Sequence, residues 1–391
     1  MKDYDFSQEE NEFITGGTTD EFVAHIKVMG VGGGGCNAVN RMIEAGIGEG
    51  VEFYAVNTDK QALNLSSATN RIQIGSRTTR GLGAGANPSQ GQIAAEEDAD
   101  GLREILRGTD LLFLTAGMGG GTGTGALPVI ANIAKEEGIL TIAVVTKPFG
   151  FEGERRMRNA ELGIENLNKN VDTLVIVPNQ KLVDTMPKDA TFKECFKKAD
   201  EILRQSIQGI VDLIVHPNTI NCDFANVKTV IQQAGMCHIG IGHGEGEDRH
   251  IQAVKDAVSS PLLETTIEGA TAVIVNITGN DIRLNEVNEA SSLIEKAIAP
   301  DALFIFGYGE NDQDEGITIT IIATGFKQKK SASLFRDEPG KVIQDIYNIP
   351  VNPAGIRQEV EQPPMPQVDD SGIENPRVRN DYSLPKFMRR R

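Results

Sequence analysis

The sequence predicts an α/β protein with a doubly wound, mostly parallel sheet, a long central helix, a smaller α+β second domain and a disordered C-terminal linker. In the first half of the chain, apolar segments of strand length alternate with helical patterns, which is typical of parallel βαβ units. An uninterrupted helical pattern then runs from about residue 192 to residue 215. Residues 328–380 hold seven of the sixteen prolines and many charges, so we expect no regular structure there.

Hydrophobic periodicity predicts six strands and four helices before the long helix. The expected strands are 25–31, 51–58, 70–75, 109–116, 139–149 and 172–179. The expected helices are 37–46, 91–108, 126–138 and 155–169.

After the long helix, the pattern predicts a second unit with more strands than helices. Its expected strands are 229–235, 270–278, 302–310 and 316–326. Its expected helices are 251–260 and 285–298.

These patterns and the family resemblance described below divide the chain into six parts. They are a disordered N-terminal tail (1–22), a first α/β domain (23–190), the central helix (191–217), a C-terminal α+β domain (218–327) that includes a loop at 220–227, a disordered linker (328–380) and a terminal peptide (381–391).

The chain carries 38 Lys and Arg residues against 55 Asp and Glu residues, a formal net charge of −17. This charge opposes nonspecific binding to nucleic acid or to an anionic membrane surface. The acidic N-terminus does not resemble a signal peptide, and no apolar run approaches the roughly 18 residues of a membrane span. We therefore expect a cytoplasmic protein that does not bind nucleic acid and does not insert into the membrane.

The cysteines and histidines give no metal-binding pattern. The four cysteines form no CxxC pair, which favours reduced thiols with structural roles. His238, His243 and His250 lie in one stretch among acidic residues, but their spacing fits no pair of ligands on a helix. We interpret this stretch as a surface loop and assign no metal ligands to the protein.

Three glycine-rich segments follow predicted strands. Residues 117–125 hold six glycines in nine positions, directly after an apolar run and before a helical pattern. Strand, glycine loop and helix is the arrangement in which backbone N–H groups and a helix N-terminus converge on an anion. Residues 30–35 form a second such loop, and residues 81–88 are also rich in glycine. Glycines of a flexible linker, the alternative, would lie among Ser, Pro and charged residues.

The second of these loops also satisfies the GxGxxG dinucleotide fingerprint, through Gly30, Gly32 and Gly35. Asp59 follows the next strand, about where a ribose-binding carboxylate is expected, so an NAD-dependent oxidoreductase is an alternative. A dinucleotide site needs one phosphate loop, whereas this chain offers more. Several amide-rich loops at one edge of the sheet suit a run of phosphates better than a single pyrophosphate, which favours a nucleoside triphosphate site. Because no Walker A sequence GxxxxGK[ST] occurs, this site would be built without the usual lysine.

Several segments resemble the FtsZ family of the tubulin/FtsZ superfamily. GGGTGTG, at 119–125, is similar to the signature loop of the superfamily. GVGGGGCNAVNRMI, NTDKQAL, GLGAGANPSQG, TKPFGFEGERR and INCDFANVKTV appear in the order found in the family. The resemblance runs from about residue 24 to residue 327, and the closing YSLPKFMRRR is similar to the family's C-terminal peptide.

This resemblance implies a GTPase that binds GTP and GDP, with Mg²⁺ accompanying the nucleotide. It assigns phosphate contacts mainly to the glycine loops, and contacts near the ribose to two charged residues. The residues that it places at the nucleotide are Gly32, Gly33, Gly34, Gly35, Asn37, Asn57, Ala84, Gly85, Gly119, Gly120, Gly121, Thr122, Gly123, Thr124, Gly125, Glu152, Arg156, Asn179, Phe196 and Asp200.

Three of these residues suit recognition of guanine. Phe196 and Asp200 are four residues apart, so they share one face of the long helix, and Asn179 follows a predicted strand. A ring can stack on the base while a carboxylate accepts from guanine N1–H and the exocyclic amine, an arrangement that adenine lacks. From the residues alone, Phe196 could instead be a core residue and Asp200 a surface charge. Glu152 and Arg156 could likewise form a solvated ion pair at the start of a helix.

The resemblance also implies that the loop at 220–227 enters the nucleotide pocket of the next subunit. The matching positions are Asn221, Asp223 and Asn226, and the family normally has aspartate at the last of them. An Asn side chain can orient a water molecule but cannot accept its proton at pH 7. The sequence leaves three explanations of Asn226 open: the protein hydrolyses GTP slowly, Asp223 has a larger role in catalysis, or residue 226 was altered deliberately.

The function implied by the resemblance is a GTPase that assembles head to tail into filaments of the bacterial division ring, at midcell beneath the inner membrane. Its partners would be other copies of itself and, through residues 382–391, membrane-anchoring and regulatory division proteins. A protein that binds GTP and assembles but hydrolyses negligibly is a second possibility, which Asn226 keeps open.

Overall fold

The computed structural model describes residues 24–47, 50–187, 189–215, 224–260, 267–310, 316–326, 346, 348 and 349. The chain divides into two units, 1–354 and 355–391, and every described residue belongs to the first. The predicted N-terminal tail, the predicted catalytic residues Asn221 and Asp223, and the predicted peptide 381–391 lie outside the described residues, as does nearly all of the predicted linker.

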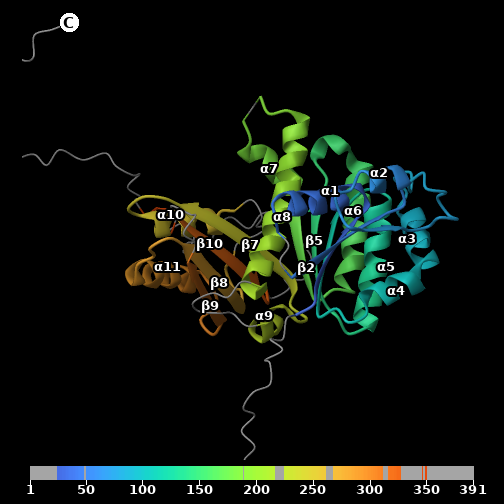
Figure 1. The fold of residues 1–391 in the computed structure, drawn as a ribbon. Helices are drawn as coiled ribbons and strands as arrows, with labels where there is room; N and C mark the ends of the chain where they lie inside the picture. The colour runs from blue at the N-terminus through green and yellow to red at the C-terminus, as the bar shows by residue number, and fades with distance from the viewer. Residues whose placement is uncertain are drawn as a thin grey trace, which may run out of the picture. The chain divides into compact units, whose positions relative to one another are not determined.

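Ten described strands form one sheet in the order β3-β2-β1-β4-β5-β6-β7-β10-β8-β9 (Figure 1). The pairs from β3 to β7 are parallel, β10 is antiparallel to both of its neighbours, and β8 and β9 are parallel. The strands are β1 (Ile26–Val31), β2 (Val51–Asn57), β3 (Asn70–Gln73), β4 (Leu111–Gly117), β5 (Leu140–Lys147), β6 (Thr173–Pro178), β7 (Gly235–Gly244), β8 (Ala272–Gly279), β9 (Leu303–Glu310) and β10 (Ile317–Thr324).

Eleven described α-helices and one short 3-10 helix, η1 (Gly150–Glu152), accompany the sheet. The α-helices are α1 (Gly32–Glu44), α2 (Lys60–Asn64), α3 (Pro88–Glu97), α4 (Ala99–Leu106), α5 (Thr122–Glu136), α6 (Glu154–Asn168), α7 (Asn179–Thr185), α8 (Phe192–Val215), α9 (Phe224–Ile231), α10 (Arg249–Val258) and α11 (Leu284–Ala297). The predicted α/β class, the mostly parallel sheet and the long helix are confirmed.

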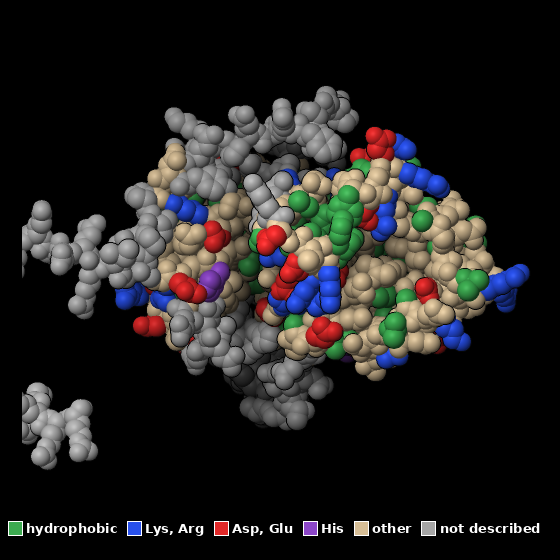
Figure 2. All heavy atoms as spheres, turned by 90° about the horizontal axis from the view of Figure 1, so that it is seen from above, with side chains coloured by type: hydrophobic (Ala, Val, Ile, Leu, Met, Phe, Trp, Pro, Cys, Tyr) green, Lys and Arg blue, Asp and Glu red, His purple; other side chains and the backbone are tan. Residues whose placement is uncertain are grey.

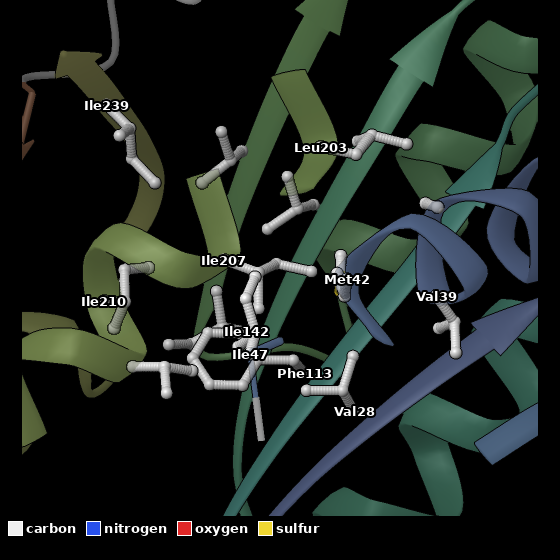
Figure 3. Close-up of a cluster of buried hydrophobic side chains, with 14 of the residues drawn as sticks. Val28, Val39, Met42, Ile47, Phe113, Ile142, Leu203, Ile207, Ile210 and Ile239 are labelled. Atoms are coloured by element: carbon white, nitrogen blue, oxygen red, sulfur yellow. The ribbon is translucent and has the colours of Figure 1, made fainter. Parts of the chain in front are cut away.

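The central strands consist of continuous apolar residues because helices cover both of their faces. In β4, Leu111 and Phe113 belong to a core shared with α1 and α8, whereas Leu112 and Leu114 belong to a second core shared with α3, α4, α5 and α6. Figure 3 shows the first core, where Phe113 and side chains of α1 and α8 lie together. Helix α8 thereby fixes the position of any residue it carries relative to the strand ends.

The strand order changes direction between β1 and β4. The chain leaves β1 for β2 on one side, and it leaves β4 for β5 on the other side. The helices that follow these two strands, α1 and α5, pack into different cores on opposite faces of the sheet. In open α/β sheets, ligands bind outside the carboxyl ends of the strands at such a switch point, and we call this place, beside the segments that follow β1 and β4, the crevice.

The predicted helix 91–108 is two helices, α3 and α4, that meet at Asp98. The backbone of Asp98 is not helical, with φ −110° and ψ 21°, and its carboxylate accepts a hydrogen bond from the amide of Gly75 at 2.7 Å. The hydrophobic periodicity continues through Asp98, so the pattern predicted a single helix. The structure has two helices because a hydrogen bond to a residue far along the chain holds Asp98 in a non-helical conformation.

The segment 229–250 was wrongly assigned from the sequence. Residues 229–231 end helix α9 instead of forming a strand, and the stretch interpreted as a surface loop is strand β7 followed by α10. The glycines of β7 made it look like a loop, but a Cβ at Gly242 would lie 2.0 Å from the carbonyl oxygen of Ala253. Glycine is present because α10 packs directly on the strand backbone.

The second part of the sheet has its own core, between α10, α11 and strands β8 and β10. Ile346, which lies in the range predicted as a disordered linker, is 2% exposed and belongs to this core. The prediction that residues 328–380 lack packed structure is therefore wrong at this residue. Among the described helices, none combines the length and apolar character needed to cross a membrane.

Candidate functional site

The two longest glycine loops meet at the switch point. Helix α1 begins at Gly32 directly after β1, and α5 begins at Thr122 shortly after β4, and these strands are paired in parallel. Within the described part of the chain, neither helix has a side-chain hydrogen bond at its N-cap. The first-turn N–H groups of both helices are therefore available to an anion, and both helix dipoles favour negative charge there.

Close backbone contacts explain why two of these positions must be glycine. Gly32 has φ +74°, and a Cβ there would lie 2.8 Å from the amide nitrogen of Gly123. Gly119 has φ +99°, and a Cβ there would lie 2.7 Å from the carbonyl oxygen of Arg156. A Cβ at Gly33 would meet nothing within 4 Å. The loops are thus packed against each other while Gly33 borders open space, as a site for phosphates requires.

The third glycine-rich segment reaches the same place. A Cβ at Gly121 would lie 2.8 Å from Cβ of Ala84, so the segment 81–88 touches the loop after β4. The hydroxyl groups of Thr58 and Thr122 are hydrogen-bonded at 2.6 Å, which joins the end of β2 to the start of α5. The structure therefore brings together the three segments that the sequence singled out.

Asp59 does not occupy the place that the dinucleotide alternative gave it. Its carboxylate accepts hydrogen bonds from the amides of Gln61 and Ala62, at 2.8 Å and 3.2 Å, and so caps helix α2. Asn57 is buried, and its Oδ1 accepts from the amide of Asp59 at 3.2 Å. The carboxylate that the alternative needs for a ribose is thus engaged in local structure.

Glu152 and Arg156 form an ion pair beside the loop after β4. The Nε of Arg156 lies 2.9 Å from a carboxylate oxygen of Glu152, whose other oxygen accepts from the amide of Phe149 at 2.8 Å. The Glu152 side chain is only 9% exposed, whereas that of Arg156 is 48% exposed. The hydrogen bond from the Phe149 amide holds Glu152 in place, and the side chain of Arg156 is exposed.

Aromatic side chains gather where α8 begins. The ring of Phe196 packs edge-on against Phe149, with centroids 5.2 Å apart, and Phe151 packs edge-on against Phe192 at 5.1 Å. Phe151, Phe192 and Phe196 are each more than 40% exposed. In the view from above, the side on which α7 and the start of α8 lie, hydrophobic side chains gather near the middle of the surface (Figure 2). An exposed aromatic face of this kind can stack on a base.

Polar groups suited to a base edge lie next to these rings. Asn179, the first residue of α7, is buried, and among the described residues its Oδ1 has no hydrogen-bond partner. Asp200 lies one turn after Phe196, and its Oδ2 is 3.7 Å from Nε of Arg41. Burial raises the pKa of Asp200 to about 6, and the charge of Arg41 opposes this rise.

The predicted binding residues differ in how accessible they are. Those buried in the loop packing or in the strand ends are Gly32, Gly35, Asn57, Ala84, Gly119, Gly121, Thr122, Gly123, Thr124, Gly125 and Asn179. Those exposed at the surface are Gly33, Gly34, Asn37, Gly85, Arg156 and Phe196. Gly120, Glu152 and Asp200 are intermediate. The buried residues shape the crevice, and the exposed ones can touch a ligand without rearrangement.

Asn226 lies far from this crevice. It is an exposed residue in the first turn of α9, which follows the end of α8, whereas α7 precedes its start (Figure 1). Helix α8 has 24 residues and is thus about 36 Å long. Asn226 therefore cannot touch a nucleotide in the crevice of its own chain.

Sequence reasoning missed Arg41, Thr58 and Phe149. Arg41 occurs in a helix whose pattern marks only its apolar face, so no signal pointed to an ion pair with α8. Thr58 is the last residue of the second predicted strand, and a search of strand ends for polar residues could have found it.

The fold and the site define a nucleotide-binding protein of the tubulin type, and comparison with known proteins agrees. Residues 25–187 match the Tubulin/FtsZ family, GTPase domain, and residues 235–327 match the FtsZ family, C-terminal domain. The chain is 39% identical to an FtsZ of M. jannaschii solved as an empty dimer, with a TM-score of 0.74, covering 81% of this chain and 95% of that one. A point mutant of M. jannaschii FtsZ is 42% identical, with a TM-score of 0.74, covering 78% and 91%.

A more distant structure shares the fold. CetZ1 from Haloferax volcanii, a GDP-bound monomer, is 19% identical with a TM-score of 0.66, and the match covers 82% of this chain and 97% of that one. Given the two family matches and the FtsZ structures, this chain belongs to the FtsZ family.

Proposed function

We propose that this chain binds GTP and GDP in the crevice at the switch point, and that it hydrolyses GTP. The observation that carries the proposal is the meeting of two helix N-termini without side-chain caps, at Gly32 and Thr122, with three glycine-rich segments. A run of phosphates carries more charge than one helix end would match, and two dipoles with many amides suit it.

Base recognition follows from the polar groups at the start of α7 and α8. Phe196 offers a ring for stacking, and Asp200 offers an acceptor for the N1–H and amino groups of guanine. The buried Oδ1 of Asn179, which lacks a partner among the described residues, can accept a further hydrogen bond. Leaving such acceptors unpaired against adenine is costly, so the site favours guanine.

Mg²⁺ is expected to arrive with the nucleotide, because it usually binds through phosphates, water and one or two protein ligands. The hydroxyl oxygens of Thr58 and Thr122 are hard oxygen donors beside the phosphate loop, and they suit this ion. When bound, Mg²⁺ neutralises charge that develops on the phosphates. The protein's own contribution there is to orient the phosphates through amides and hydroxyl groups.

Hydrolysis would require two subunits. The loop that the family resemblance assigns to catalysis, 220–227, follows α8 at the end away from the crevice, and Asn226 lies beyond reach of its own nucleotide. A head-to-tail contact would insert this loop, with Asn221, Asp223 and Asn226, into the crevice of the next subunit. Such a heterologous contact does not close, so it produces a filament.

One related structure supports self-association, because the FtsZ of M. jannaschii was solved as a dimer. CetZ2 from Haloferax volcanii, solved as a protofilament bound to GTPγS, is only 20% identical and supports the shared fold alone. We extend the proposal to filaments that form the bacterial division ring in the cytoplasm, beneath the inner membrane at midcell.

Residues 382–391 would connect the filament to its partners. Leu384, Phe387 and Met388 offer apolar anchors beside Lys386 and three arginines, which suits docking in the groove of a membrane-anchoring or regulatory division protein. Deleting 382–391 should leave GTP-driven assembly unchanged and abolish binding to such a partner. Loss of assembly in the deletion variant would instead assign these residues to the filament itself.

One observation favours a second function, assembly with negligible hydrolysis. Asn226 replaces the aspartate that the family normally has at this position of the loop. Its side chain cannot act as a base at pH 7, so catalysis would rest on Asp223 alone. Removing a negative charge near the triphosphate does not oppose binding or assembly.

Pelleting with GTP, with phosphate release measured on the same sample, tests these functions together. A hydrolysing filament gives protein in the pellet and phosphate in solution, whereas the second function gives the pellet without phosphate. Parallel samples with GDP and with ATP control for nucleotide state and for the base. If GTP neither binds nor changes the amount pelleted, the proposed function is wrong.

A further inference from the structure

Arg41 connects the helix that begins at the phosphate site to the helix that carries the base-reading residues. It lies on α1, nine residues after Gly32, and α1 packs against α8 in a shared core. Its Nε is 3.7 Å from Oδ2 of Asp200, whose side chain is only 17% exposed. Among the described residues, Arg41 is the cation paired with this carboxylate.

The separation of the two groups matters. At 3.7 Å the contact is an ion pair but too long for a hydrogen bond. The Nε of Arg41 is buried and, among the described residues, makes no hydrogen bond. The Nε of Arg41 therefore supplies charge to Asp200 without a hydrogen bond of normal length, and the carboxylate retains acceptor positions for a ligand.

Two other carboxylates lie near this ion pair on the same two helices. Glu44, on the next turn of α1, lies 3.6 Å from a terminal nitrogen of Arg41 and is 63% exposed. Glu201, which follows Asp200 on α8, is paired with Arg204 and also feels the charges of Lys198 and Arg41. Arg41 is thus the charge that favours the ionised form of Asp200 against the cost of burial.

We propose that Arg41 is a positioning residue for guanine recognition, which keeps the Asp200 carboxylate ionised and oriented while leaving it acceptor positions for the base. This inference rests on the proposed guanine site. It makes base recognition depend on a residue of the phosphate-binding helix, so that a shift of α1 relative to α8 would change affinity for the base.

Titration of GDP into the full chain, kept too dilute to assemble, tests the role of Arg41 between pH 6 and pH 9. The pKa of Asp200 is about 6, so roughly nine tenths of the carboxyl groups are ionised at pH 7. Loss of an opposite charge raises a carboxyl pKa by about one to three units, so Arg41→Met should weaken GDP binding roughly two- to tenfold or more at pH 7, and much less at pH 9. Arg41→Lys should restore most of the affinity.

Two controls separate charge from packing. Glu44→Gln, which changes the exposed partner of Arg41, should leave GDP affinity and its pH profile unchanged. Asp200→Asn replaces the titrating group by an amide, which suits xanthine, and its affinity for xanthosine diphosphate should not change when Arg41→Met is added. A loss of GDP affinity that is equal at every pH, or a loss that persists with Asp200→Asn, would overturn the inference. A wild-type chain that binds no GDP would instead refute the proposed function.

Discussion

Gly33 and Gly101 form a natural comparison inside this protein. Each lies in a helix, and a Cβ at either position would meet nothing within 4 Å. Gly33 faces the open side of the crevice, whereas Gly101 lies on α4, in the layer formed by α3, α4, α5 and α6. A methyl group added at these positions therefore differs mainly in whether it enters the space proposed for the phosphates.

We expect Gly33→Ala to weaken GDP binding by about tenfold or more, because the methyl group would hold the phosphates away from the first-turn amides. Its melting temperature should not fall. Gly101→Ala should leave GDP affinity unchanged and stabilise the fold by roughly 0.5–1 kcal/mol, the usual gain within a helix. Titration calorimetry and thermal melts of both variants provide the comparison, and equal affinities would remove Gly33 from the site.

We expect the carboxylate of Asp200 to determine which base the protein binds. Its carboxylate can pair with the donors of guanine but not with adenine, so ATP should compete poorly with labelled GTP for the wild-type chain. Asp200→Ala should lose affinity for GTP and discriminate less between the two nucleotides. A wild-type chain that binds ATP as tightly as GTP would contradict the assignment of this residue.

Strands and helices with strong periodicity could be predicted from the sequence, because burial on one or two faces alone decides them. The bounds of α8 were predicted in this way. The glycine loops after β1 and β4 were predicted from their composition and from their place between a strand and a helix. The break at Asp98 and the strand β7 could not be predicted, because each depends on a contact far along the chain, to Gly75 and to α10. The pairing of Arg41 with Asp200 could not be predicted for the same reason, since α1 and α8 are distant in sequence.

The contact between β7 and α10 gives a test of this explanation. Gly242→Ala should destabilise the fold by about 1–3 kcal/mol, because its Cβ would lie 2.0 Å from the carbonyl oxygen of Ala253 and the helix must move. Ile241→Val, at the neighbouring position on the other face of β7, should cost only about 0.5–1.5 kcal/mol. Urea unfolding of both variants measures these differences, and an unchanged midpoint for Gly242→Ala would show that α10 packs more loosely.

The crevice and Asn226 lie at opposite ends of α8 in one chain, which makes assembly central to the proposed chemistry. Each subunit would present a nucleotide at one end and a catalytic loop at the other. Filament formation would then complete the active site, and hydrolysis would follow assembly. The residue at position 226 should set how long each filament persists.

Asn226→Asp should increase GTP turnover per assembled subunit and shorten filament lifetime, because a carboxylate can take or relay the proton of the attacking water. Positioned acid–base groups of this kind contribute roughly 10²–10⁴-fold. Affinity of the unassembled chain for GTP should change little, since Asn226 is remote from its own crevice. Phosphate release normalised to pelleted protein measures the effect, and an unchanged rate would mean that this loop is not the catalytic element or that Asn226 already performs the task.

The most direct test of a shared active site is the GTP hydrolysis rate per subunit, measured for the full chain over a wide range of protein concentrations. A site completed by the next subunit predicts almost no hydrolysis below the concentration at which pelleting begins, and a rate per subunit that rises steeply above it. GTP should remain bound on both sides of that threshold. A rate per subunit that is the same at every concentration would show that one chain holds the whole active site, and would contradict the account.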